Sequence, residues 1–392
     1  MKIDPYKHKD KYLKWKERVK DGIPGISKKN SDVILQYIFD MENGLNVSSK
    51  SVKGARSYIR LNNLRQRMIF LAKQFERYSD AALTELSEEH LFKFFNAMRN
   101  GSIKRVDGKE YQSVVDFVKP FKAFWHWHMK VHKKMRINIP DITEDLDVSK
   151  PKPRWVYLAE ENVRKLCDNA KAEYRVLIMF LYDTGIRSPT ELINVKVSDL
   201  YENCKKVHIR EDIVKKGSFG RKINLMLCSD LLKQHISDNG LQPDDQLFGI
   251  CPPVVNRYLK RLAKRVLGEG VSPAGEKYCN LTMYDFRHCS CCYWLPRYKS
   301  ESALKYRFGW RKSDKIHYYS ELLGMKDTIS EEDMLVDMTK TEIERRLLKT
   351  ERENEILKEK QEAYNTDVSQ LKALMQVYIA KLNQLEQMQI AN

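Results

Sequence analysis

The first stretch of the sequence that could do chemistry surrounds Arg187. An apolar run ends at Gly185. Ser188, Pro189 and Glu191 then stand at the N-cap, first and third positions of a helix that the sequence predicts to begin there, with Glu191 in a structural, capping role. Arg187 would lie in a tight corner beside a helix N-terminus, which is a ready site for an anion. A surface salt bridge is the more ordinary fate of a lone arginine.

Two further stretches carry groups of a related kind. In the second, Tyr284 precedes Arg287 and His288 at the start of an apolar run. In the third, Trp310 follows a glycine, and Tyr319 comes nine residues later. Guanidinium and indole N–H groups donate hydrogen bonds, and a tyrosine hydroxyl can act as a nucleophile. Each stretch alone is a weak signal, but their order and spacing together are a strong one.

The order of these motifs resembles that of the tyrosine recombinases, the family of the lambda-type phage integrases. The matching pieces are Thr-Gly-x-Arg ending at Arg187, Arg287 with the histidine after it, Gly-Trp ending at Trp310, and Tyr319. The resemblance covers residues 30–323, and segments 23–27 and 41–47 are similar to archaeal integrases, which points to a mobile genetic element. It implies a site-specific recombinase or integrase whose two domains clamp DNA between them.

The resemblance also implies a role for each residue. Arg187 and Arg287 would grip the scissile phosphate and stabilise its pentavalent transition state. Trp310 would donate its indole N–H to the same phosphate. Tyr319 would be the nucleophile, leaving a 3′-phosphotyrosine and a free 5′-hydroxyl. Lys216, in a predicted hairpin turn, would be the general acid that protonates the leaving 5′-oxygen.

Two assignments stay open. Lys215 and Lys222 are alternatives to Lys216, because the turn is longer than is usual in the family. Three residues before the second arginine, where the family usually has His or Lys, this chain has Tyr284, whose phenol has an ordinary pKa of about 10 and is a poor base at neutral pH. Either catalysis is slower for this reason, or His288 takes over the role of the missing residue. If it does not, His288 is a supporting contact.

The net charge of +17 indicates a polyanionic partner, most often a nucleic acid. Residues 335–392 have a net charge of −1, so the remaining residues carry +18. Residues 1–29 alone hold ten Lys or Arg against four Asp or Glu. Because the positive charge is concentrated outside the tail, we expect double-stranded DNA as the partner rather than a gain in solubility alone.

The apolar pattern predicts a mainly α fold with a small β-hairpin, divided into two domains. Apolar residues recur at helical spacing through residues 30–139. Residues 206–210 and 222–227 flank a glycine-containing turn, which is typical of a hairpin. The predicted divisions are a basic N-terminal arm (1–29), a helical core-binding domain (30–139), a proline-rich linker (140–153), a mixed α/β catalytic domain (154–324) and a C-terminal helix or coiled coil (325–392).

The C-terminal tail carries a repeat in which apolar residues alternate at spacings of four and three. This pattern favours a coiled coil over a single amphipathic helix, and Asn354 at an a position favours a parallel dimer. We therefore expect a dimer on one DNA site, and the resemblance to the tyrosine recombinases implies a tetramer in the synapse. The seam consists of Ile343, Leu347, Thr350, Asn354, Leu357, Gln361, Tyr364, Val368, Leu371, Met375, Tyr378, Leu382 and Leu385.

The sequence predicts neither a cofactor nor a metal. It has no Gly-rich phosphate loop, and the Cys-x-x-Cys pair of Cys289 and Cys292 lacks the second pair that a zinc site needs. No stretch approaches 18 apolar residues and no secretory signal is evident, so we expect a cytoplasmic, nucleoid-associated protein with no membrane partner.

Two other functions share most of these features. A DNA-binding regulator on the same fold would explain the charge, but it has no reason to hold two arginines, a tryptophan and a tyrosine in this register. A type IB topoisomerase shares the catalytic constellation, but it acts as a monomer and does not need a dimerising tail.

Overall fold

The computed structural model describes residues 2–47, 53–150, 152–215, 218–298 and 300–323, and scattered positions between 347 and 379. Residues 1–322 form one unit, and the residues from 323 onward form a second. The described chain is mainly helical with one small antiparallel sheet, as the sequence predicts. No helix of the described residues is long and apolar enough to cross a membrane.

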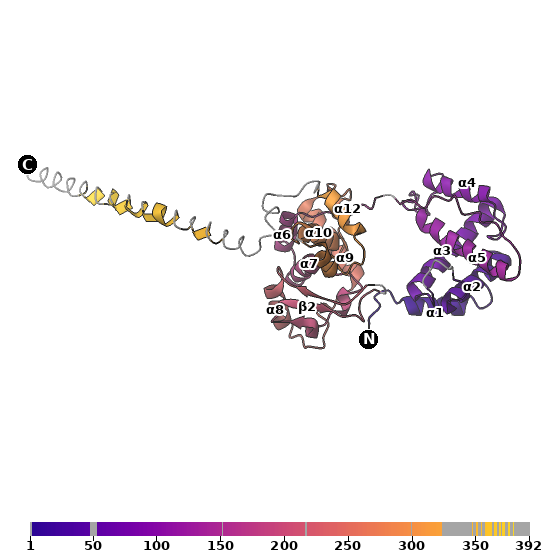
Figure 1. Cartoon of the computed structure of the whole chain (residues 1–392), viewed down its shortest axis with the longest axis horizontal. Coiled ribbons are helices and arrows are strands. Elements are labelled where there is room, and N and C mark those ends of the chain that lie inside the picture. Colours follow the sequence, from indigo (N-terminus) through magenta and orange to yellow (C-terminus); the bar gives the residue numbers. More distant parts are fainter. Residues whose placement is uncertain are drawn as a thin grey trace, which may run out of the picture. The chain divides into compact units, whose positions relative to one another are not determined.

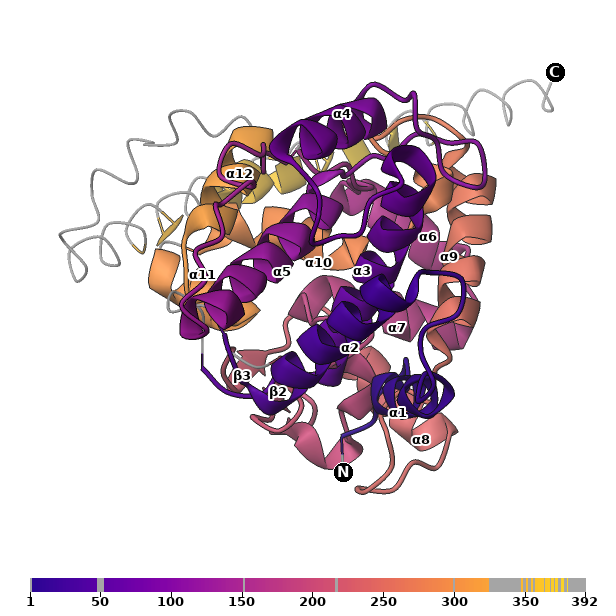
Figure 2. The ribbon, with the colours of Figure 1, turned by 90° about the vertical axis from the view of Figure 1, so that its right-hand side faces the viewer.

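The described residues of the N-terminal part of the chain form five helices (Figure 1). Helix α3 packs against α1, α2 and α5, and these helices run close together in Figure 2. Side chains buried at helical spacing form one aromatic-rich core between them. The helices are α1 (His8–Arg18), α2 (Lys28–Asn43), α3 (Tyr58–Ser79), α4 (Glu88–Arg99) and α5 (Val115–Lys134).

Residues 1–29, expected to form a basic arm, contain helix α1. Its Tyr12 and Trp15 are 1% and 5% exposed and belong to the same core as the helices that follow. The basic side chains of α1 lie on its other faces, so the segment combines a charged surface with a packed apolar stripe. The exact domain boundaries stay a prediction.

The second part of the chain holds the remaining helices and the sheet. An apolar helix, α7, packs against α6, α8 and α10. The α-helices are α6 (Glu160–Asp168), α7 (Ala172–Thr184), α8 (Ser229–Asp238), α9 (Pro252–Leu267), α10 (Asp285–Trp294), α11 (Glu301–Phe308) and α12 (Asp314–Leu322), and the 3₁₀ helices are η1 (Leu192–Asn194), η2 (Val197–Asp199), η3 (Tyr278–Asn280) and η4 (Leu295–Arg297).

The sheet is the predicted hairpin with one strand more. Strands β2 (Lys206–Ile209) and β3 (Arg221–Asn224) pair antiparallel, with Val207 opposite Ile223. The two-residue strand β1 (Leu200–Tyr201) pairs with β2 on its other edge. Residues on β3 alternate between buried and exposed, so Arg221 faces inward and Lys222 faces outward.

The helix predicted to begin at Ser188 is not formed. The Ser188–Pro189 peptide bond is cis, and the chain makes turns before the short η1. The Ser188 hydroxyl is buried and caps no backbone N–H. Glu191 therefore has another role than the capping that the sequence suggested, and the site geometry below identifies it.

In the C-terminal unit, the described positions between 347 and 379 are all helical and exposed. Among the residues of the predicted seam, Leu357, Tyr364 and Leu371 are 60–73% exposed. An apolar stripe in this state is what a coiled coil would bury. The seam positions Ile343, Tyr378, Leu382 and Leu385 lie outside the described residues, and the coiled coil stays a prediction.

Removing a central ring of the helical core should test the packing. Phe121 is 0% exposed and contacts Phe75, Phe95 and Trp125. We expect Phe121→Ala to lower the free energy of unfolding by about 3–5 kcal/mol, since it removes apolar contacts and leaves a cavity. The control is Phe39→Ala on α2, which is 50% exposed and should change stability by less than about 0.5 kcal/mol. Equal effects in urea unfolding would contradict this core.

Candidate active site

Arg187 lies in the corner between α7 and η1, at the place that the sequence predicts for an anion site. Its guanidinium donates to Glu191 Oε1 at 2.7 Å, to Ser218 Oγ at 3.1 Å and to the carbonyl oxygen of Gly309 at 3.1 Å. Its side chain is 18% exposed. The guanidinium is thus held firmly on one side while part of its surface stays open to a ligand.

Arg287, on α10, reaches the same corner from inside the protein. It is 4% exposed and donates to the carbonyl oxygens of Gly185 at 2.5 Å and Phe308 at 2.6 Å. Burial and then the positive charges of Arg187 and Arg221 lower the pKa of Arg287 to about 10. The guanidinium remains cationic at neutral pH, and a nearby anion would stabilise it.

A glycine is required where α7 ends. Gly185 has a φ of +56°, and a Cβ there would stand 2.2 Å from a ring carbon of Phe308. The left-handed conformation turns the chain toward Arg187, while the absent side chain lets α11 approach. The Gly185 carbonyl then accepts the bond from Arg287, so this position links the two arginines.

Glu191 is the carboxylate that organises the cluster. Its side chain has no solvent exposure and accepts from Arg187 at 2.7 Å and from Arg221 at 2.8 Å. Burial acts to raise the pKa of Glu191, but Arg221 and then Arg187 outweigh it and hold the pKa below its ordinary value. Glu191 is therefore ionised and orients both guanidiniums, which corrects the purely capping role expected from the sequence.

Tyr319 lies on α12 against the arginine corner. It is 2% exposed, and its ring stacks on Trp310 at 6.0 Å with an interplanar angle of 11°. Its hydroxyl is hydrogen-bonded to His288 Nδ1. Burial raises the pKa of Tyr319 well above its ordinary value, with Arg287 opposing the shift. The hydroxyl of the neighbouring Tyr318 instead donates a hydrogen bond to the carbonyl oxygen of Pro153.

The other predicted residues lie at the margin of this cluster or outside the described chain. Tyr284 is 48% exposed, and its ring meets that of His288 at 5.2 Å. Lys215 is exposed in the hairpin turn, and Lys222 faces outward over the Tyr201 ring. Lys216 is outside the described residues. The structure thus brings Arg187, Arg287, Trp310, His288 and Tyr319 together and leaves the lysine undecided.

Two residues of the site escaped the sequence analysis. Arg221 is 1% exposed and donates to Glu191 and to the carbonyl oxygen of Arg307. Its signal was a charged residue at an inward-facing strand position, where a buried ion pair is the usual reason. Trp155 is 3% exposed and stacks on His288 at 4.7 Å. Trp155 follows the predicted linker and carried no signal of its own.

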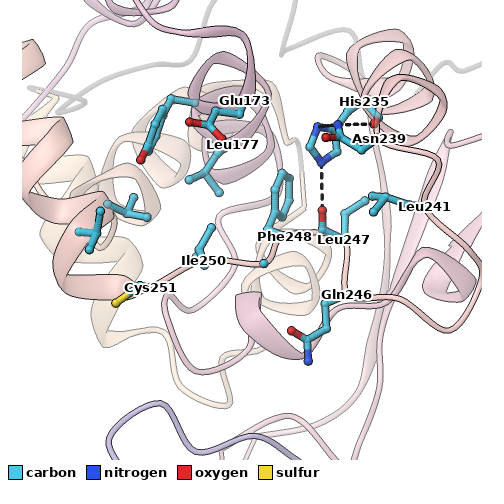
Figure 3. Close-up of a pocket in the computed structure, with 14 residues that line it drawn as sticks. Glu173, Leu177, His235, Asn239, Leu241, Gln246, Leu247, Phe248, Ile250 and Cys251 are labelled. Carbon is cyan, nitrogen blue, oxygen red and sulfur yellow. Dashed lines mark hydrogen bonds between the residues drawn. The ribbon is translucent and has the colours of Figure 1, made fainter.

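A pocket of about 400 Å³ lies elsewhere, between α7, α8 and the start of α9 (Figure 3). Its walls include Leu177, Phe248 and Cys251, and His235 there bonds the carbonyl oxygen of Leu247 at 3.1 Å. The lining contains neither of the arginines described above and no tyrosine of α12. The pocket is therefore separate from the candidate site.

The architecture is the fold of the tyrosine recombinases. The solved Tn1549 transposon integrase in complex with transposon right end DNA is similar, with a TM-score of 0.55 and 13% identity over 79% of this chain and 98% of that chain. A lambda integrase dimer bound to a COC′ core site is also similar, with a TM-score of 0.55 and 14% identity over 76% and 98%. No protein-family model and no curated protein matches the sequence. Similarity at this identity establishes the fold, and the site carries the argument about function.

The buried carboxylate should make stability depend on pH in a defined way. Because the folded-state pKa of Glu191 is lowered, its stabilising effect is complete above the unfolded value of about 4.3 and is lost as the pH falls through the folded value. We expect Glu191→Gln to cost about 3–5 kcal/mol at neutral pH, since it leaves buried guanidiniums uncompensated. The difference from the unmodified protein should shrink on acidification in denaturant unfolding.

The matched control is Glu161→Gln, which removes an exposed carboxylate paired with Lys165 on α6. Because this pair is exposed, the substitution should change stability far less than Glu191→Gln does at neutral pH. A constant cost of Glu191→Gln across the acidic range would mean that shape, rather than charge, holds the corner together.

Proposed function

We propose that this protein is a site-specific DNA recombinase, or integrase, that cleaves and rejoins DNA through a 3′-phosphotyrosine on Tyr319. The observation that carries the proposal is the convergence of Arg187, Arg287 and Trp310 with a buried tyrosine on the tyrosine-recombinase fold. The reaction conserves the energy of the phosphodiester in the protein–DNA bond, so it requires no nucleotide cofactor.

The two arginines would bind the scissile phosphate through its non-bridging oxygens. Arg187 is already oriented by Glu191 and by the carbonyl oxygen of Gly309, and Arg287 is oriented by two other backbone carbonyls, so little reorganisation is needed when negative charge builds up on the phosphate. Preorganised donors of this kind are worth about 3–4 kcal/mol each in the transition state. The indole N–H of Trp310 would be a third donor.

The general acid would be Lys216, which protonates the leaving 5′-oxygen. Ser218, two residues further along, accepts a hydrogen bond from Arg187, which supports a position of this turn beside the phosphate. Lys215 and Lys222 remain alternatives for this role. The phenol of Tyr284 would line the site at the position, three residues before Arg287, where the family usually has a His or Lys.

Double-stranded DNA would also contact the helical domain. A hollow of about 530 Å³ beside α2, α3 and α5 includes Arg56, Arg60, Lys119, Lys122 and His126 among the residues that line it. Arg60 and Lys119 are exposed there. Basic side chains around a hollow suit the sugar–phosphate backbone, which binds largely through charge. The two similar solved structures described above are DNA complexes, and one is a dimer on its site.

The nucleophile is the first part of this proposal to test. We expect Tyr319→Phe to bind DNA but to form no covalent adduct, because it lacks the attacking oxygen. Tyr318→Phe should still cleave, since its hydroxyl is engaged by Trp155 and by Pro153 in the described state. The measurement is a denaturation-resistant adduct on DNA that flanks the protein's own gene, with the modified residue mapped by mass spectrometry.

Each outcome assigns the chain to one class. An adduct at Tyr318 would move the nucleophile by one residue. Specific DNA binding without any adduct would favour a regulator that has lost the chemistry. Relaxation of a plasmid that lacks a recombination site would favour a topoisomerase. Strand exchange between two sites would support the recombinase.

The tail should act in synapsis. We propose that residues 340–392 form a parallel two-stranded coiled coil that pairs protomers and raises their local concentration for a four-protomer synapse. We expect a chain without 340–392 to lose recombination between two sites while single-site cleavage stays nearly intact. Asn354→Leu should shift the dimer toward larger assemblies, as measured by analytical ultracentrifugation. Full recombination by the truncated chain at low concentration would contradict this role.

A further inference from the structure

The hydroxyl of Tyr319 is hydrogen-bonded to the imidazole of His288, and not to Tyr284, which stands where the family usually has its base. His288 Nδ1 and Tyr319 Oη are 2.5 Å apart, and they come from α10 and α12. His288 directly follows Arg287, so the same turn of α10 presents a phosphate-binding guanidinium and an imidazole. Tyr284, one helical turn earlier, meets His288 through its ring.

A buried phenol needs a proton acceptor before it can attack phosphorus. Burial raises the pKa of Tyr319, so its hydroxyl is protonated at neutral pH. With Tyr319 only 2% exposed, bulk water has little access to it. Guanidiniums have no acceptor, whereas an imidazole has an ordinary pKa of about 6.5 and is a base near neutral pH.

The imidazole is held in place by the rings around it. Trp155 stacks on His288 at 4.7 Å with an interplanar angle of 28°, and Tyr284 meets it edge-on at 76°. Trp155 is itself fixed, because its carbonyl oxygen accepts from Ser272 Oγ at 3.1 Å and its N–H donates to the carbonyl oxygen of Ala274 at 3.4 Å. These contacts keep Nδ1 directed at the Tyr319 hydroxyl.

We propose that His288 is the general base for Tyr319, with Trp155 as its positioning residue. The inference rests on the proposed function and adds the group that moves the nucleophile's proton. As Tyr319 Oη bonds to phosphorus, its proton passes to His288 Nδ1, the P–O5′ bond breaks, and the 5′-oxygen takes a proton from the general acid. In rejoining, the 5′-hydroxyl gives its proton back to the deprotonated general acid as it attacks phosphorus, the P–Oη bond breaks, and His288 returns its proton to Tyr319.

The test compares two substitutions of the same histidine in the full chain. His288→Ala removes the base, and His288→Asn keeps a hydrogen-bonding side chain that is not basic at neutral pH. We expect both to slow adduct formation by about 100- to 10,000-fold, the usual range for general acid–base catalysis. Added imidazole should restore much of the rate to His288→Ala, whose vacated space lies between two rings, but not to His288→Asn.

The controls separate this role from its rivals. His317→Asn removes an exposed histidine of the nucleophile's own helix and should react at the unsubstituted rate. Tyr284→Phe should lose less than about tenfold, below the usual range for general acid–base catalysis, and should not respond to imidazole. A 5′-thiolate leaves without being protonated, so DNA with a 5′-thio leaving group bypasses the general acid but not the base. We expect His288→Ala to form the adduct slowly on this DNA as well. Full rescue of its rate would make His288 the general acid and overturn the proposal.

Three further results would overturn the assignment. Normal adduct formation by His288→Asn would reduce His288 to a hydrogen-bonding contact. A slow His288→Ala that imidazole does not restore would indicate a structural role. A complete loss in Tyr284→Phe alone would return the base to position 284. If the unsubstituted protein forms no adduct at all, the proposed function fails and this inference with it, whereas the other results leave the recombinase proposal standing.

Discussion

The bond pattern of Glu191 is the constraint on which the rest of the site depends. One carboxylate with no solvent exposure accepts hydrogen bonds from Arg187 and Arg221. Arg287 lies close enough for the positive charges of these two arginines to lower its pKa. Three guanidiniums with one carboxylate leave an excess of positive charge in a buried place. Coulomb attraction for an anion is strong where water is scarce, so this excess is suited to a phosphate.

Backbone carbonyls orient the arginines without neutralising them. Arg287 donates to Gly185 and Phe308, and Arg187 donates to Gly309. These acceptors are neutral, so the guanidiniums keep their charge for a ligand while their rotamers are fixed. The ends of α7 and α11 must therefore meet, and the glycine at 185 permits that approach because any Cβ would overlap the Phe308 ring.

Sequence patterns predict the elements better than the contacts between them. Helical spacing identified α2 to α5, and the turn glycines identified the β2–β3 hairpin, because both signals are local. Motif order grouped Arg187, Arg287, Trp310 and Tyr319. The helix predicted at Ser188 was wrong: Glu191, its expected third residue, is instead buried against Arg187 and Arg221. The role of Arg221 depends on a partner 30 residues away, so strand alternation can indicate a buried charge at this position but cannot identify Glu191 as its partner.

The energetics of the arginine cluster also bear on whether the fold retains its chemistry. Burying an ion pair costs desolvation energy, and apolar residues of similar volume are often more stable by about 1–4 kcal/mol. The desolvation cost of this cluster exceeds that of a simple ion pair, because Arg221 Nη1 has no hydrogen-bond partner among the described residues and the cations outnumber the carboxylate. A protein that only bound DNA would place its cations on an exposed face, as in the hollow of α3 and α5. Charge held inside at the expense of stability is what the proposed recombinase chemistry would require of this site.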